Sequence, residues 1–161
     1  MRARDVMSGP VITIGPEATL AEVARLLDQH KISGVPVVDA SGQMVGMISE
    51  HDLILASQRV QLTRLRDPFA WVSPHATLDD VVSFRRGLAQ VGQTPVKEVM
   101  TRKLITVDED ECLEAVAQLM CRRKINRLPV LRRGRLVGII SRGDLISAIA
   151  ALTERKPHAL D

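Results

Sequence analysis

The sequence predicts an α/β (α+β) protein built from two copies of one strand–helix–strand–strand–helix (βαββα) unit, with a helical insertion between them. Segments 93 residues apart match over about 50 residues, and each copy alternates short apolar runs with amphipathic helical patterns. Aromatic residues make up 2% of the chain, so the core is expected to be aliphatic. We expect the copies to pack about a pseudo-twofold axis, with two related clefts between them.

The matches between the copies follow one register. Val6-Met7-Ser8 corresponds to Val99-Met100-Thr101 at an offset of 93 residues. One residue is then lost in a turn, so Gly46-Met47-Ile48-Ser49 meets Gly138-Ile139-Ile140-Ser141 at an offset of 92. A single register with one gap at a loop indicates an internal duplication.

Each copy is predicted to contain the same elements in the same order. An apolar run forms a first strand and leads into a helix with apolar residues at i, i+3, i+4 and i+7. Two further strands flank a turn that contains glycine, which is typical of a hairpin, and a second helix follows. The expected strands are Val11–Ile14, Val35–Val38 and Met44–Ser49, then Leu104–Val107, Leu128–Leu131 and Leu136–Ser141, with final helices from Glu50 and Arg142.

The first helix of each copy is predicted to start in a different way. Thr19 and Glu22 have the spacing of a capping box. The second copy has Cys112 in place of the threonine, so its helix is expected to begin by other means, from Asp110. Cys112 and Cys121 are expected to be buried or half-buried thiols on different faces of this helix, which predicts neither a disulfide nor a shared metal ion.

The connector between the copies matches neither copy in full. We expect its helix to begin at Thr77, and it holds all the aromatic residues, Phe69, Trp71 and Phe84. These aromatic side chains either anchor the connector to the core or form a partner-binding patch. The predicted parts of the chain are a first repeat at 1–56, the helical connector at 57–94, a second repeat at 95–152 and a C-terminal tail at 153–161.

Composition and charge narrow the function. No apolar run approaches the ~20 residues needed to cross a bilayer, and no signal-peptide core follows the charged start, so a cytoplasmic protein without membrane contact is expected. The formal net charge is +3. Basic residues gather in the second copy, which indicates either an anionic partner or a solvated basic surface. They are Arg122, Arg123, Lys124, Arg127, Arg132, Arg133, Arg135 and Arg142.

The candidate binding chemistry lies where a strand becomes a helix, at Ser49 with Asp52 and at Ser141 with Asp144. Unpaired N–H groups at a helix start and a nearby hydroxyl suit a phosphate or ribose oxygen, and a carboxylate can accept hydrogen bonds from ribose hydroxyls. The same spacing is nearly a capping box, so the alternative is that both residues only close their own helix. The residue types alone leave both interpretations open.

The sequence resembles a tandem pair of CBS domains, the small modules named after cystathionine β-synthase. The resemblance rests on the Val-Met-Ser/Thr segments, on 32–38 and 125–130, and on two Gly-h-h-Ser-x-x-Asp segments in which h is apolar. It covers about residues 2–56 and 95–150. It implies a regulatory module, not an enzyme, that binds AMP, ADP, ATP or S-adenosylmethionine, forms a homodimer and signals to an unknown partner protein by a conformational change.

The resemblance also implies two composite sites in the clefts between the repeats. In such a site, the Val-Met-Ser/Thr segment of one repeat and the strand that contains its Pro-Val pair hold the adenine. The Ser-x-x-Asp segment of the other repeat holds the ribose and the phosphate. One site would use Ser8, Ile12, Ile32, Ser33, Gly34, Ile139, Ser141, Arg142 and Asp144. The other would use Thr101, Ile105, Ile125, Asn126, Arg127, Met47, Ser49 and Asp52.

The two expected sites differ in charge. Arg142 follows one serine, whereas Glu50 follows the other and would repel a phosphate. Arg127 replaces a glycine, so it either crowds the second adenine pocket or reaches a phosphate. We therefore expect nucleotide at the Ser141/Asp144 site, with Arg127 and Arg142 as the phosphate contacts.

The sequence is also compatible with functions other than nucleotide sensing. One alternative is a ligand-free dimerisation or interaction module in which the Ser and Asp residues act as caps. Another is nucleic-acid binding through the basic second repeat, although the scarcity of aromatic residues argues against base stacking. The four histidines lack metal-ligand spacing and no nucleophile has a neighbouring base, so no catalytic residue, metal site or resident cofactor is expected.

Overall fold

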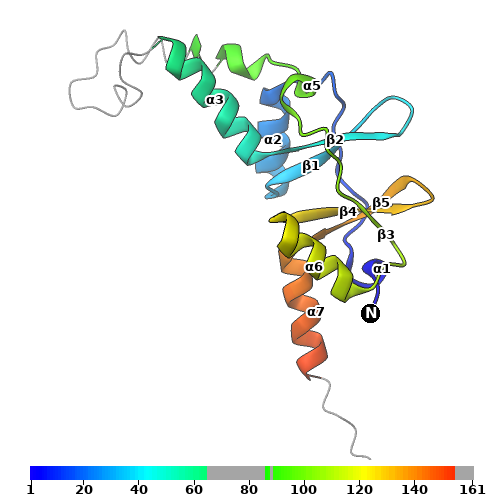
Figure 1. The fold of residues 1–161 in the computed structure, drawn as a ribbon. Coiled ribbons are helices and arrows are strands. Elements are labelled where there is room, and N and C mark those ends of the chain that lie inside the picture. The colour runs from blue at the N-terminus through cyan, green and yellow to red at the C-terminus, as the bar shows by residue number, and fades with distance from the viewer. Residues whose placement is uncertain (65–85, 88, 155–161) are drawn as a thin grey trace, which may run out of the picture. The chain divides into compact units, whose positions relative to one another are not determined.

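The computed structural model describes residues 1–64, 86–87 and 89–154, which Figure 1 shows as coloured ribbon. The chain divides into two compact units, unit 1 (Met1–Ile12 with Ile105–Asp161) and unit 2 (Thr13–Leu104). Most of the predicted helical insertion, including its expected start at Thr77 and its aromatic residues at 69, 71 and 84, lies outside the described residues.

Unit 1 is a three-stranded sheet with helices. Its sheet order is β3-β4-β5, with β3 parallel to β4 and β4 antiparallel to β5. The core is aliphatic, as predicted, and includes Val116 and Met120 from the first long helix against Leu128 and Ile140 from the sheet. The elements are α1 (Ala3–Val6), β3 (Val107–Asp108), α6 (Leu113–Arg123), β4 (Arg127–Arg132), β5 (Arg135–Ser141) and α7 (Arg142–Glu154).

Unit 2 repeats this plan with a shorter sheet. Strands β1 and β2 pair antiparallel, and Ile14 makes a single parallel bridge to Val37 where the first strand at 11–14 was predicted. Val23 and Leu27 of the first helix are buried, as their helical spacing predicted. The elements are α2 (Leu20–His30), β1 (Gly34–Val38), β2 (Met44–Ser49), α3 (Glu50–Arg64) and α5 (Val96–Val99).

The two hairpin turns lie where glycine predicted them. Gly42 has a φ of 83°, and the shorter turn of unit 1 places both Arg133 (φ 51°) and Gly134 (φ 79°) in the left-handed region. Two consecutive residues with positive φ are the mark of a type I′ turn, whose twist matches that of the flanking strands. The hairpins of both units are therefore set by local turn chemistry.

Helix starts differ between the units, as expected, but one predicted start is wrong. Thr19 and Glu22 form the predicted capping box of α2. In unit 1 the N-cap of α6 is Cys112 and not Asp110, and its side chain makes no capping hydrogen bond. Cys112 and Cys121 are both free and exposed, which corrects the expectation of covered thiols. Cys112 is exposed because the N-cap lies outside the buried stripe of the helix.

Each unit contains a short segment that, in the sequence, directly precedes the repeat of the other unit. We call residues 1–12 and 95–104 the lead-in segments. In unit 1 the N–H of Leu113 donates to the carbonyl of Met1 over 3.1 Å. In unit 2 the N–H of Leu20 donates to the carbonyl of Thr94, just before the lead-in segment, over 3.0 Å. Each lead-in segment thus packs with the repeat from the other half of the sequence. The carbonyls of Met1 and Thr94 accept hydrogen bonds from helix-start N–H groups that would otherwise lack partners.

A glycine in each unit lets the lead-in methionine reach the sheet. A Cβ atom on Gly138 would lie 2.2 Å from Sδ of Met7, and one on Gly46 would lie 2.6 Å from Sδ of Met100. Both glycines are buried in the second strand of their hairpin. These contacts explain why both copies keep glycine at this position of the strand.

Candidate functional site

The Ser141–Asp144 pair closes the start of α7 in unit 1. The N–H and the hydroxyl of Ser141 donate to Oδ2 of Asp144 over 2.7 and 2.6 Å, and the N–H of Asp144 donates back to the Ser141 hydroxyl over 3.2 Å. This is the reciprocal arrangement of a capping box. Both side chains are half-buried. The pair therefore has a structural role, and Oδ1 of Asp144 is left outside the cap.

The lead-in segment brings Ser8 to this second carboxylate oxygen. Ser8 exchanges two backbone hydrogen bonds with Ile139, of 2.9 and 3.1 Å. The Ser8 hydroxyl then donates to Oδ1 of Asp144 over 3.4 Å, a long hydrogen bond. Four predicted residues of one site, Ser8, Ile139, Ser141 and Asp144, are thus neighbours within unit 1.

Arginine side chains border the same helix start. Arg127 is the cross-strand partner of Ser141 in the β4–β5 ladder, and directly opposed residues share a face of the sheet. Arg142, exposed, is the first residue of α7, and its N–H donates to the carbonyl of Asn126 over 3.2 Å. The repeat relates this pair to one in unit 2. Arg127 matches Gly34 and Ser141 matches Ser49, and Gly34 lies opposite Ser49 in the hairpin of unit 2. Arg127 was predicted as a member of the site of Ser49 and Asp52, and its position opposite Ser141 in the ladder was not predicted.

Unit 2 holds the matching helix start with different charge. The N–H and hydroxyl of Ser49 each donate to Oδ2 of Asp52 over 2.8 Å, and Thr101 exchanges backbone hydrogen bonds with Met47. Its neighbours are Gly34, opposite Ser49, and Glu50, whose N–H donates to the carbonyl of Ser33. Two arginines of unit 1 thus correspond to a glycine and a glutamate in unit 2.

The other predicted site residues are divided between the units. Ile12, Ile105 and Ile125 belong to unit 1, and Ile32 belongs to unit 2. All four are half-buried apolar side chains. They are available for apolar contact, as expected for residues proposed to hold a base.

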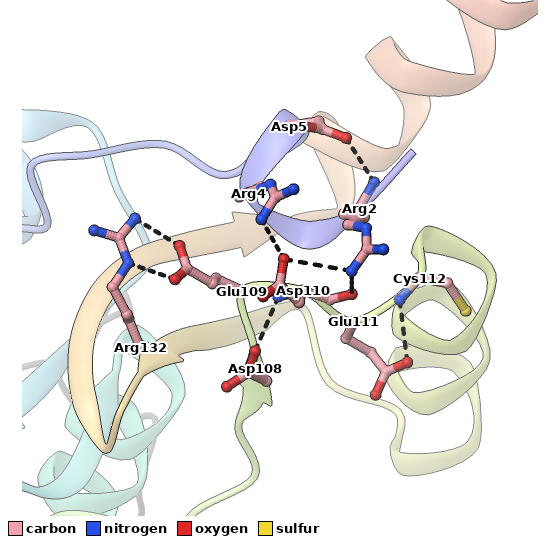
Figure 2. Close-up of polar contacts among 9 residues, drawn as sticks. All are labelled: Arg2, Arg4, Asp5, Asp108, Glu109, Asp110, Glu111, Cys112 and Arg132. Atoms are coloured by element: carbon pink, nitrogen blue, oxygen red, sulfur yellow. Dashed lines mark hydrogen bonds and ion pairs between the residues drawn. The ribbon is translucent and has the colours of Figure 1, made fainter.

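A second polar cluster surrounds the lead-in helix α1 (Figure 2). Arg4 forms an ion pair with Asp110, whose Oδ1 also lies 3.4 Å from Nη1 of Arg2. Arg132 of β4 makes a two-pronged contact with the carboxylate of Glu109, which includes a 2.6 Å hydrogen bond from Nη2 to Oε2. The Glu109 side chain is only 12% exposed, so its carboxylate is largely shielded from solvent in this pair.

Glu109 is expected to stabilise the fold at neutral pH and to lose that effect in acid. The hydrogen bonds from Arg132 hold the pKa of Glu109 below its ordinary value of 4.5, and the charges of Arg132, Arg4 and Arg133 act in the same direction. A lowered folded-state pKa stabilises the protein above the ordinary pKa, and the effect disappears as the pH falls through the folded-state pKa. The Glu109→Gln variant should therefore unfold at a lower temperature than the wild type at neutral pH.

Thermal unfolding of both proteins from neutral pH to below about pH 4 measures this difference. The gap between the two midpoints should close in acid, when Glu109 is protonated and resembles glutamine. The difference isolates Glu109, because Glu22 and Asp39, whose pKa values are also lowered by hydrogen bonds, are present in both proteins. A gap that is constant with pH would contradict the assignment.

Neither a metal site nor a membrane-spanning helix is found in the described part of the chain. Residues 1–64, 86–87 and 89–154 contain no group of three or more His, Cys, Asp or Glu side chains placed to hold a metal ion. Within the same residues, no helix is both long and apolar enough to cross a membrane.

A duplicated α/β unit with a Ser-x-x-Asp helix start in each copy defines a tandem pair of small modules. The family model for the CBS domain matches residues 3–59 and 96–151. The chain belongs to this family and is a tandem CBS pair protein.

Similar proteins share this architecture over most of the chain. A protein of Methanocaldococcus jannaschii is 36% identical over 154 residues, which cover 92% of this chain and 91% of the relative. A CBS domain-containing protein of Bacillus subtilis is 32% identical over 142 residues, 88% of this chain and 81% of the relative. A crystal structure of another CBS domain pair, in complex with 5′-methylthioadenosine and S-adenosyl-L-methionine, is 27% identical, with a TM-score of 0.67 and coverage of 94% and 98%.

Proposed function

We propose that this protein is a regulatory module that binds an adenosine nucleotide, AMP, ADP or ATP, at the start of α7. The observation that carries the proposal is the Ser141–Asp144 helix start bordered by Arg127 and Arg142. The positive potential at a helix start favours a phosphate, and a guanidinium pairs with phosphate through two hydrogen bonds. Oδ1 of Asp144, which lies outside the cap and accepts a long hydrogen bond from Ser8, is the acceptor for a ribose hydroxyl.

The related CBS pair that holds 5′-methylthioadenosine and S-adenosyl-L-methionine supports an adenosine ligand. Neither of those ligands carries a phosphate group, and S-adenosyl-L-methionine offers an arginine one carboxylate but also carries a positive ammonium and sulfonium. The two arginines of unit 1 favour a nucleotide over S-adenosylmethionine in this chain. Binding would act on a partner protein by shifting the population of conformers, not by catalysis.

We also propose that the protein is a homodimer. Helix α7 exposes Ile146, Ile149 and Leu152, with 66%, 55% and 48% of their surface accessible, and α3 exposes Ile54 and Leu55. Large apolar side chains in a contiguous exposed stripe are typical of an interaction surface. The resemblance to CBS pairs makes a second copy of this chain the expected occupant.

Asp144→Ala is expected to weaken nucleotide binding by about tenfold to a hundredfold, because it removes a charged hydrogen-bond acceptor from the ligand. Isothermal titration with AMP, ADP and ATP measures the effect. Asp52→Ala is the matched control, since it removes the same capping bonds from the equivalent helix of unit 2. Its effect should be much smaller.

Two outcomes would count against this proposal. Equal or reversed effects of the two substitutions would contradict the preference for unit 1. No heat with any adenosine ligand up to millimolar concentration would contradict nucleotide binding itself. The ligand-free alternative then gains support, because the Ser and Asp side chains already have a complete role as caps.

A further inference from the structure

A charged cleft lies at the tip of the β4–β5 hairpin of unit 1. Its volume is about 480 Å³. Val137, the lining residue nearest to Ser141 along β5, lies four residues and roughly 13 Å from it, so the cleft is distinct from the start of α7. Its polar lining consists of Asp108 at the end of β3, Glu109 and Asp110 directly after it, and Arg132, Arg133 and Arg135 of the hairpin.

The carboxylates of this cleft already have partners. Glu109 is paired with Arg132, and Asp110 is paired with the arginines of α1, as Figure 2 shows. Oδ1 of Asp108 accepts the backbone N–H of Asp110 over 3.0 Å. The charges of Glu109 and Asp110 are therefore already matched by arginines, whereas Asp108 accepts a backbone hydrogen bond.

Two arginines of the cleft have no such partner. Arg133 and Arg135 are exposed and form no ion pair with any described residue. Three guanidinium groups and three carboxylates line the cleft, and Asp110 is also contacted by Arg2 and Arg4 from outside it, so the donors of Arg133 and Arg135 are left over. Guanidinium groups with unused donors are suited to oxyanions.

The turn itself does not require these arginines. Arg133 has a φ of 51°, a conformation in which asparagine, aspartate or glycine is favoured over other residues. The hairpin of unit 2 closes instead through Asp39, whose Oδ1 accepts hydrogen bonds from Ser41 and Gln43. The arginines are thus an addition of the second repeat to a turn that forms without them.

We propose that this cleft binds a small oxyanion, a phosphate or a carboxylate group, between Arg133 and Arg135. Val137 lines the same cleft and offers an apolar surface to the remainder of the ligand. The site is separate from the nucleotide site, so the two proposals stand or fall independently.

Titration of the full chain with sodium phosphate and with disodium succinate, at constant ionic strength, tests this site by NMR. Saturable shifts of the backbone amides of residues 132–137 are expected with one or both anions. The anion with the lower apparent Kd identifies the favoured group. Arg133→Asn combined with Arg135→Gln should raise the apparent Kd at least tenfold, and asparagine preserves the left-handed turn.

The control is Arg122→Gln with Arg123→Gln, which removes the same charge from α6 of the same unit. It should leave the apparent Kd within a factor of two. No saturable shift with either anion at millimolar concentration would overturn the proposal. An equal loss in both double variants would also overturn it, because the effect would then come from net charge alone.

Discussion

Gly138→Ala is expected to destabilise the protein by roughly 1–3 kcal/mol, the usual effect of adding a carbon atom to a closely packed core. The new Cβ would lie 2.2, 2.7 and 2.9 Å from Sδ, Cγ and Cβ of Met7. The thioether can rotate away, but Cβ of Met7 moves only with the backbone. That backbone is held by the adjacent hydrogen bonds between Ser8 and Ile139.

Chemical denaturation of the wild type and the variant measures this effect. Without the clash, alanine would stabilise a strand relative to glycine by roughly 0.5–1 kcal/mol, so the sign of the change is informative. Gly46→Ala is the matched control in unit 2, where the added Cβ would meet Sδ of Met100 at 2.6 Å and no other atom below 3.1 Å. Its effect should be smaller.

A double variant sharpens the test. Adding Met7→Ala to Gly138→Ala removes the two closest atoms and should recover part of the lost stability, which gives a favourable coupling in a double-mutant cycle. A Gly138→Ala protein at least as stable as the wild type would show that the lead-in segment does not pack against β5 as described.

Ile146→Glu combined with Ile149→Glu is expected to convert the proposed dimer into a monomer. Burial of an isoleucine stabilises an interface by roughly 1.5–3 kcal/mol, and the variant replaces two of them in each protomer with charges that resist burial. The dimer dissociation constant should therefore rise by at least about a hundredfold. Sedimentation velocity over a range of concentrations measures the change.

The control places the same charges elsewhere on the helix. Ser147 and Ala151 are exposed residues of α7 outside its large apolar stripe, so Ser147→Glu with Ala151→Glu should leave the dimer intact. Circular dichroism should show both double variants folded, because none of the four positions is buried. A wild-type protein that is monomeric at high concentration would contradict the dimer proposal.

Local chemistry accounts for what could be predicted from the sequence. The capping box at Thr19 and the glycines of the two turns each depend on residues close in sequence, and the structure confirms them. The start of α6 was predicted wrongly because its first N–H uses the carbonyl of Met1, a partner 112 residues away. No local pattern contains that information.

The repeat pattern alone did not predict the exchange of lead-in segments, which was expected only through the family resemblance that grouped Ser8 with Ser141 and Asp144. Matching at an offset of 93 residues shows which segments are alike but not which copy each segment packs against. The position of Arg127 opposite Ser141 depends on strand register, which is set by the turn and by the apolar face. The charge difference between the helix starts was visible from Glu50 and Arg142, and its effect on binding stays a prediction.

The exchange of lead-in segments also bears on how such a chain can arise. A polypeptide with one repeat and one lead-in segment could reproduce these contacts only as a pair of molecules that trade lead-in segments, as in domain swapping. Duplication within one gene converts that trade into an intramolecular one and replaces the protein concentration by a much higher effective concentration. Once both partners are tethered, each copy is free to diverge, and the arginines of the second repeat illustrate such divergence on a shared scaffold.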